Sequence, residues 1–92
     1  MQTYDENPEQ AEADIKQASD ELSKLELERA VAEVREEALV AEIDSAYDAK
    51  DDAALANATR RHAEVERKLE ALRQDIKSAE EHVSSTQASW GF

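Results

Sequence analysis

The only proline of this chain, Pro8, and its only glycine, Gly91, lie near opposite ends of the sequence. Both residue types interrupt helices, so the long stretch between them contains no strong helix breaker. Ala, Glu, Leu, Lys, Arg and Gln, the strongest helix formers, dominate that stretch. An all-α fold is therefore expected, and β-sandwiches and barrels, which need turn residues between short strands, are disfavoured.

Apolar residues recur along the chain at alternating intervals of four and three, the heptad spacing of packed helices. Two such series, called seams here, account for most of the chain, and three members are charged or titratable. The first seam is Ala11, Ile15, Ala18, Leu22, Leu25, Arg29, Ala32, Glu36, Leu39, Ile43 and Ala46, and the second is Leu55, Ala58, His62, Val65, Leu69, Leu72, Ile76, Ala79 and Val83.

The two seams do not share one register, and the slip between them falls between Ala46 and Leu55. The intervening stretch is the most polar part of the middle of the chain, and Asp48, Asp51 or Asp52 can cap a new helix there. The sequence therefore predicts a helix over about residues 8–47, a turn over about 48–51 and a second helix over about 52–85.

An antiparallel coiled-coil hairpin pairs the two seams in a single register along their whole length. Ala46 then lies opposite Leu55, and Leu25 opposite Ile76. Charged residues beside the seams do not decide between a hairpin and one continuous helix, because attractive and repulsive pairs balance in the hairpin register. Glu42 and Arg61, for example, form an attractive pair. The alternative is one continuous helix of about 75 residues, with a skip residue, in a parallel coiled coil.

The start of the first helix has its own sequence signal. Asn7 is a good N-cap, Pro8 suits the first helical position, and Gln10 can reach back to the Asn7 backbone as a capping-box partner. Residues 1–7 and about 86–92 are expected to be tails.

The first helix carries a second line of apolar residues on the side roughly opposite its seam. The second helix has charged residues in the equivalent place. Helices that are apolar on two sides usually lie between neighbours, so a partner is expected: a second copy joined through the helix of residues 8–47 in a four-helix assembly, or a different protein. Scattered exposed residues without a role are the alternative. The second line of apolar residues on the first helix, called the outer stripe here, consists of Leu27, Val31, Val34, Ala38 and Ala41.

Three aromatic residues of the tails are candidate anchors for a partner. Tyr4 lies near one end of the chain and Trp90 and Phe92 near the other, and a hairpin brings these ends together. Such side chains often fill pockets on a partner protein. Trp90 and Phe92 covering the open end of their own hairpin is an equally acceptable interpretation.

Charged groups at seam positions reduce stability but can fix the register or oligomeric state of a coiled coil. Arg29, Glu36 and His62 are the candidates for this role. In the hairpin register Glu36 and His62 are neighbours, which predicts a structural pair, with Arg29 extending outward to solvent. A pH-sensitive switch at His62 is a further possibility.

The charge of the chain is strongly acidic, with 23 Asp and Glu against 11 Lys and Arg and a net charge of −12. Direct binding to nucleic acid, which requires neutralisation of phosphates by basic groups, is therefore disfavoured. The same charge supports an alternative function, an acidic mimic that occupies the basic groove of a nucleic-acid-binding protein, as anti-restriction or anti-CRISPR proteins do.

No residue pattern points to chemistry. There is no cysteine, His62 and His82 lack a second histidine at i+4, and neither a Glu-x-x-His motif nor a glycine-rich phosphate loop occurs. No catalytic, cofactor or metal site and no small-molecule substrate are expected. Apolar runs are too short for a membrane span and no signal peptide is visible, which predicts a cytoplasmic protein. The expected function is a non-enzymatic protein-interaction module of structural, adaptor or assembly-accessory type, such as a scaffold, chaperone-like or virion-type subunit.

Overall fold

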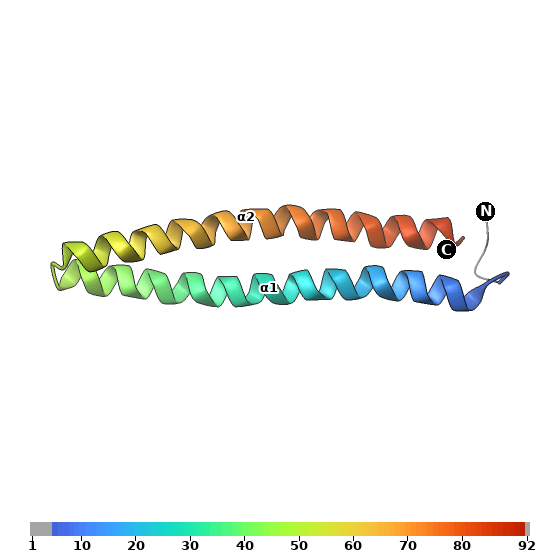
Figure 1. Ribbon diagram of the computed structural model, residues 1–92, viewed down its shortest axis with the longest axis horizontal. Coiled ribbons are helices and arrows are strands. Elements are labelled where there is room, and N and C mark those ends of the chain that lie inside the picture. Colours follow the sequence, from blue (N-terminus) through green and yellow to red (C-terminus); the bar gives the residue numbers. More distant parts are fainter. Residues whose placement is uncertain (1–4, 92) are drawn as a thin grey trace. The chain divides into compact units, whose positions relative to one another are not determined.

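The computed structural model describes residues 5–91, which form two α-helices and no strand (Figure 1). Helix α1 covers Pro8–Asp48 and α2 covers Asp52–Ser89, with a short turn between them. The predicted all-α helical hairpin is therefore confirmed, and the single continuous helix is excluded. Tyr4 and Phe92, two of the expected anchors, lie outside the described residues.

The chain divides into two compact units. The first contains α1 up to Leu27 together with α2 from Gln74 onward, and the second is the continuous segment Glu28–Arg73, which includes the turn. Within each unit, a segment of α1 lies beside a segment of α2 that runs in the opposite direction (Figure 1).

Asn7 caps the start of α1 as the sequence predicts. Its side-chain Oδ1 accepts a hydrogen bond from the Gln10 backbone N–H at 3.3 Å, and its carbonyl oxygen accepts one from the Ala11 N–H at 3.1 Å. The second half of the capping box differs, because the Gln10 side chain donates forward to Asp14 Oδ1 at 2.8 Å. Asp14 can compete for this donor because it lies one turn further along the same face.

The turn between the helices is built around Lys50, whose φ of 55° is left-handed. The Asp51 N–H donates to the Ala46 carbonyl at 3.0 Å, and the Lys50 N–H donates to the Tyr47 carbonyl at 3.1 Å. This pair of bonds is a Schellman motif, which satisfies carbonyl groups at the end of α1. Asp51 then caps α2, since its Oδ1 accepts from the Ala54 N–H at 3.1 Å.

Lys50 is a position where the sequence is not optimal for its backbone. A Cβ atom in the left-handed region costs about 1 kcal/mol, which glycine avoids. We expect Lys50→Gly to raise the free energy of unfolding by about 1 kcal/mol, and Asp51→Ala to lower it by about 1 kcal/mol through loss of the cap. Urea denaturation followed by circular dichroism measures both. Destabilisation by Lys50→Gly would contradict the left-handed geometry of the turn.

Helix α2 continues to Ser89, beyond the end expected near residue 85. The apolar spacing explains this, because Thr86 and Trp90 extend the second seam by two more positions and both are at least half-buried. The Thr86 hydroxyl also donates to the His82 carbonyl at 2.8 Å, so it does not interrupt the helix. Gly91, at a φ of 85°, follows the helix end.

The core of each unit follows the predicted seams. Ala11, Ala18, Ile76 and Trp90 are buried in the first unit. The buried apolar residues of the second unit are Ala32, Leu39, Ala46, Ala58, Val65 and Leu72. Half of these buried positions are alanine, so the helix interface buries little surface for its length.

Other large seam residues of the second unit are only half-buried, including Ile43, Leu55 and Leu69. Each packs against one helix on one side, and no third helix of the described chain covers its flanks. Small domains with so little buried surface are usually marginal in stability.

Candidate functional site

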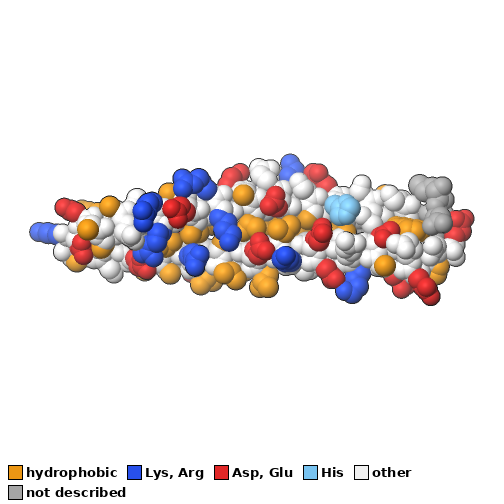
Figure 2. All heavy atoms as spheres, viewed as in Figure 1, with side chains coloured by type: hydrophobic (Ala, Val, Ile, Leu, Met, Phe, Trp, Pro, Cys, Tyr) orange, Lys and Arg blue, Asp and Glu red, His pale blue; other side chains and the backbone are white. Residues whose placement is uncertain are grey.

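The largest exposed apolar side chains of the described residues lie mainly on α1. Leu27, Val31 and Val34 are 66%, 63% and 68% exposed. Ala38 and Ala41, the remaining members of the outer stripe, are also exposed. Figure 2 shows apolar side chains along the edge of α1 that faces away from α2, in addition to those between the helices.

Four members of the outer stripe lie in the second unit, while Leu27 is the last residue of the first. At about 100° per residue, Val31, Val34, Ala38 and Ala41 fall on one face of α1. The seam residues Ala32 and Leu39, which are buried against α2, lie on the other side. The second unit therefore presents an apolar helix face that the hairpin does not cover.

Near the turn, Ala38 and Ala41 also line a shallow groove of about 530 Å³. An ion pair between Glu42 of α1 and Arg61 of α2 lies in its wall, which confirms the attraction predicted for these two residues. Small side chains of this kind permit another helix to approach closely. The groove contains six alanines: Ala38, Ala41, Ala46, Ala49, Ala54 and Ala58.

Arg29 extends outward to solvent as the sequence predicts, so it is not a polar core residue that fixes the register. Its side chain is exposed and lies 3.7 Å from Glu33 Oε1 on the same helix, while its neighbour Glu28 is half-buried. After Leu25, the next half-buried residue of α1 is Glu28, three residues on. The regular heptad predicts Arg29, four residues on, at this position. A long charged side chain has a strong preference for water, which favours this outward position.

Glu36 and His62 are half-buried at the seam positions where the sequence places them. His62 Nε2 lies 3.7 Å from Glu66 Oε1, one turn further along α2. One potential ligand atom from each of Glu36, His62 and Glu66 lies within 4.8 Å of the others. The second unit therefore brings an imidazole and two carboxylates together across the two helices.

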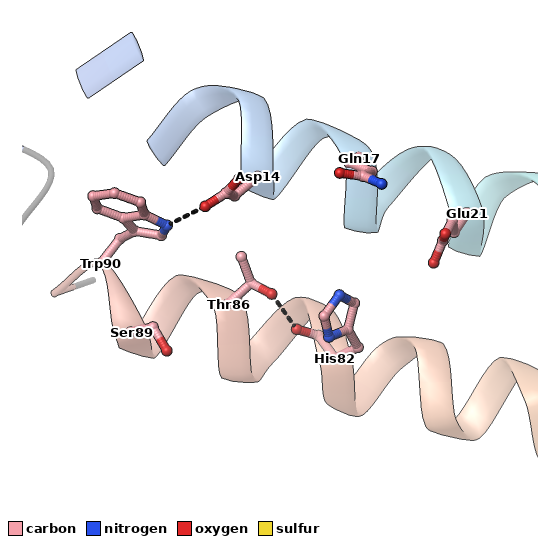
Figure 3. Close-up of a pocket in the computed structure, with 7 residues that line it drawn as sticks. All are labelled: Asp14, Gln17, Glu21, His82, Thr86, Ser89 and Trp90. Atoms are coloured by element: carbon pink, nitrogen blue, oxygen red, sulfur yellow. Dashed lines mark hydrogen bonds between the residues drawn. The ribbon is translucent and has the colours of Figure 1, made fainter. Parts of the chain in front are cut away.

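Trp90 lies against its own hairpin in the first unit, with only 9% of its surface exposed. Its indole Nε1 donates to Asp14 Oδ2 at 3.1 Å (Figure 3). Asp14 thereby accepts hydrogen bonds from both Gln10 and Trp90 and ties the beginning of α1 to the residue that follows α2. Trp90 thus covers the open end of its own hairpin, the second of the two roles that the sequence allows, and is buried there rather than presented to a partner. The depression beside it, of about 340 Å³, is lined by Asp14, Gln17, Glu21, His82, Thr86, Ser89 and Trp90.

Trp90 is the only tryptophan, so tryptophan emission, excited selectively over the two tyrosines, reports on this contact alone. We expect blue-shifted emission from the native protein and a red shift on unfolding in urea. Trp90→Phe should lower the free energy of unfolding by about 1 kcal/mol, because Asp14 loses a donor, and Asp14→Asn, which retains an acceptor, should cost less. Native emission as red as that of the unfolded chain would show that the indole is free.

Sequence reasoning missed two residues that the structure brings into these sites. Glu66 joins Glu36 and His62, and its signal was present in the i,i+4 spacing from His62 on the helix. Asp14 accepts the hydrogen bond of Trp90. If the predicted register is extended to Trp90, the indole lies level with Ala11, which is one helical turn from Asp14. Neither contact was predicted, because each depends both on the spacing of residues along one helix and on the register between the two helices.

The chain matches no protein-family model, no curated protein and no solved structure. Neither helix within residues 5–91 contains a stretch that is both long and apolar enough to cross a bilayer. A function is therefore inferred from the residues of the chain itself.

Proposed function

We propose that this chain is a non-enzymatic protein-interaction module that self-associates through α1, as a structural or assembly-accessory subunit. The observation that carries the proposal is the exposure of Val31 and Val34, each above 60%, on the face of α1 that the hairpin leaves uncovered. Each large apolar side chain left in water forgoes about 1.5–3 kcal/mol of burial. A second copy supplies that burial on both chains at once.

The spacing of the outer stripe suits an antiparallel contact between two copies of α1. With a two-fold axis at Val34, that residue meets Val34 of the second copy, Leu27 lies level with Ala41 of the second copy, and Val31 lies one residue away from the level of Ala38. Each large residue then faces a small one or its own equivalent, so the two helix backbones approach closely. The four helices are ordered α2, α1, α1, α2, with both copies of α1 in the middle.

Charge supports α1 rather than α2 as the shared helix. The outward side of α2 carries exposed charged residues such as Arg60 and Arg67, whose desolvation would be costly. The net charge of −12 on each copy opposes association, and salt screens this repulsion. Self-association through an apolar stripe is therefore expected to persist, or to strengthen, as ionic strength rises.

Sedimentation velocity of the purified chain at low and high ionic strength tests the proposal. We expect a dimer whose dissociation constant falls or stays constant as salt is added. A monomer at every accessible protein concentration, under both conditions, would overturn self-association.

The net charge of −12 supports a second candidate function, an acidic mimic that binds the basic groove of a nucleic-acid-binding protein. Its signature is the opposite salt dependence, because binding between opposite charges weakens steeply as ionic strength increases. A monomeric chain that binds a basic protein only at low salt would favour this candidate over the interaction module.

A further inference from the structure

We propose that Glu36, His62 and Glu66 of the second unit form a binding site for a divalent transition-metal cation of the zinc type. One potential ligand atom from each residue lies within 4.8 Å of the other two. Glu36 comes from α1, while His62 and Glu66 come from consecutive turns of α2, so a bound ion would join the two helices.

The distances suit a small ion with short bonds. Zinc lies about 2.1 Å from nitrogen and oxygen ligands, so two ligands of a tetrahedral site are about 3.4 Å apart. His62 Nε2 and Glu66 Oε1 already lie at 3.7 Å. Glutamate side chains have three rotatable bonds, and small rotations of Glu36 and Glu66 bring the remaining separations into this range.

The chemistry of the group favours a transition metal over magnesium. A neutral imidazole and two carboxylates carry a formal charge of −2, which a divalent cation balances. Imidazole nitrogen suits zinc, copper and nickel, whereas Mg²⁺ prefers an octahedral set of oxygen ligands. Three protein ligands leave a fourth tetrahedral position for water.

The surroundings of Glu36 provide an independent reason for an additional ligand. Glu36 as a whole residue is half-buried at a seam position, and no hydrogen bond or ion pair engages its carboxylate among residues 5–91. Partly desolvated carboxylates are normally paired, since burial disfavours the charged form. A cation bound between Glu36 and His62 would supply this partner and would fix the register of α1 against α2.

The first test is calorimetric titration of the metal-free chain with Zn²⁺ at neutral pH, in about 0.15 M salt and excess Mg²⁺ to occupy nonspecific carboxylates. We expect one Zn²⁺ per chain and a rise in the thermal unfolding midpoint, because the ion binds only the folded hairpin. Absence of binding, or binding that excess Mg²⁺ abolishes, would overturn the proposal.

Substitutions locate the ion. Glu36→Gln, His62→Gln and Glu66→Gln should each weaken Zn²⁺ binding by about tenfold or more. His82→Gln is the matched control, because it removes the other histidine, in the first unit, and it should bind as the wild type does. Equal loss in His82→Gln, or unchanged binding in His62→Gln, would contradict the assignment.

Glu66→Gln keeps the test decisive if His62→Gln loses helix content, because Glu66 is exposed and its replacement cannot disturb the core. The outcome is also separable from that of the self-association proposal. Glu36 lies on the seam side of α1, away from Val34, so a chain made monomeric at Val34 should still bind one Zn²⁺.

Discussion

Val34→Glu is expected to convert a dimer of this protein into a folded monomer. Val34 is 68% exposed in the single chain, so glutamate is readily tolerated there when the chain is alone. At a two-fold axis, however, the substitution places two carboxylates against each other in a desolvated contact, which costs several kcal/mol. We expect the dimer dissociation constant to rise by at least about 100-fold, measured by sedimentation equilibrium.

Val40→Glu is the matched control for this variant. Val40 is on the same helix and is also exposed, at 44%, but it lies outside the outer stripe. The same chemical change there adds the same charge without touching the proposed contact, so the dimer should survive. Equal dissociation of both variants would show that added charge alone, rather than the stripe, controls assembly. Circular dichroism of both proteins should show wild-type helix content.

The features that repeat along the sequence were the ones that could be predicted from it. A heptad series averages over many residues, so Ala32, Leu39, Leu72 and Ile76 were placed in the core although no single one of them is diagnostic. Capping is equally local, and the Asn7 side chain performs the predicted function within one turn. The ion pair between Glu42 and Arg61 followed once the register was set by the seams.

Individual positions that depart from the regular pattern were harder to predict from the sequence. Arg29 extends outward as expected, but the sequence did not predict that its neighbour Glu28 is half-buried instead. Lys50 adopts a left-handed φ that the sequence signals only weakly, because glycine is the usual residue there. Whether Trp90 served a partner or its own chain depended on a cross-helix acceptor, Asp14, which no local pattern reveals. These positions depend on the energies of individual contacts rather than on periodicity.

Leu39→Ala is expected to remove much of the stability of the second unit. Leu39 is one of the two leucines buried in that core, at 4% exposure, and its neighbours along the α1 seam include small residues such as Ala32 and Ala46. Truncation leaves a cavity that these alanines cannot fill, at a cost of about 2–4 kcal/mol. Domains of this size often have little more than about 5 kcal/mol in total. Urea unfolding followed by circular dichroism measures the loss.

Leu27→Ala provides the matched comparison, because it makes the same truncation on the same helix where the side chain is 66% exposed. Both substitutions are best made in a Val34→Glu background, so that dimer dissociation does not contribute to the unfolding free energy. There, Leu27→Ala should change stability by no more than about 0.5 kcal/mol, since surface replacements by a good helix former are nearly neutral. A loss for Leu27→Ala comparable to that for Leu39→Ala would mean that the outer stripe is buried within the monomer, and the proposed contact surface would then not exist.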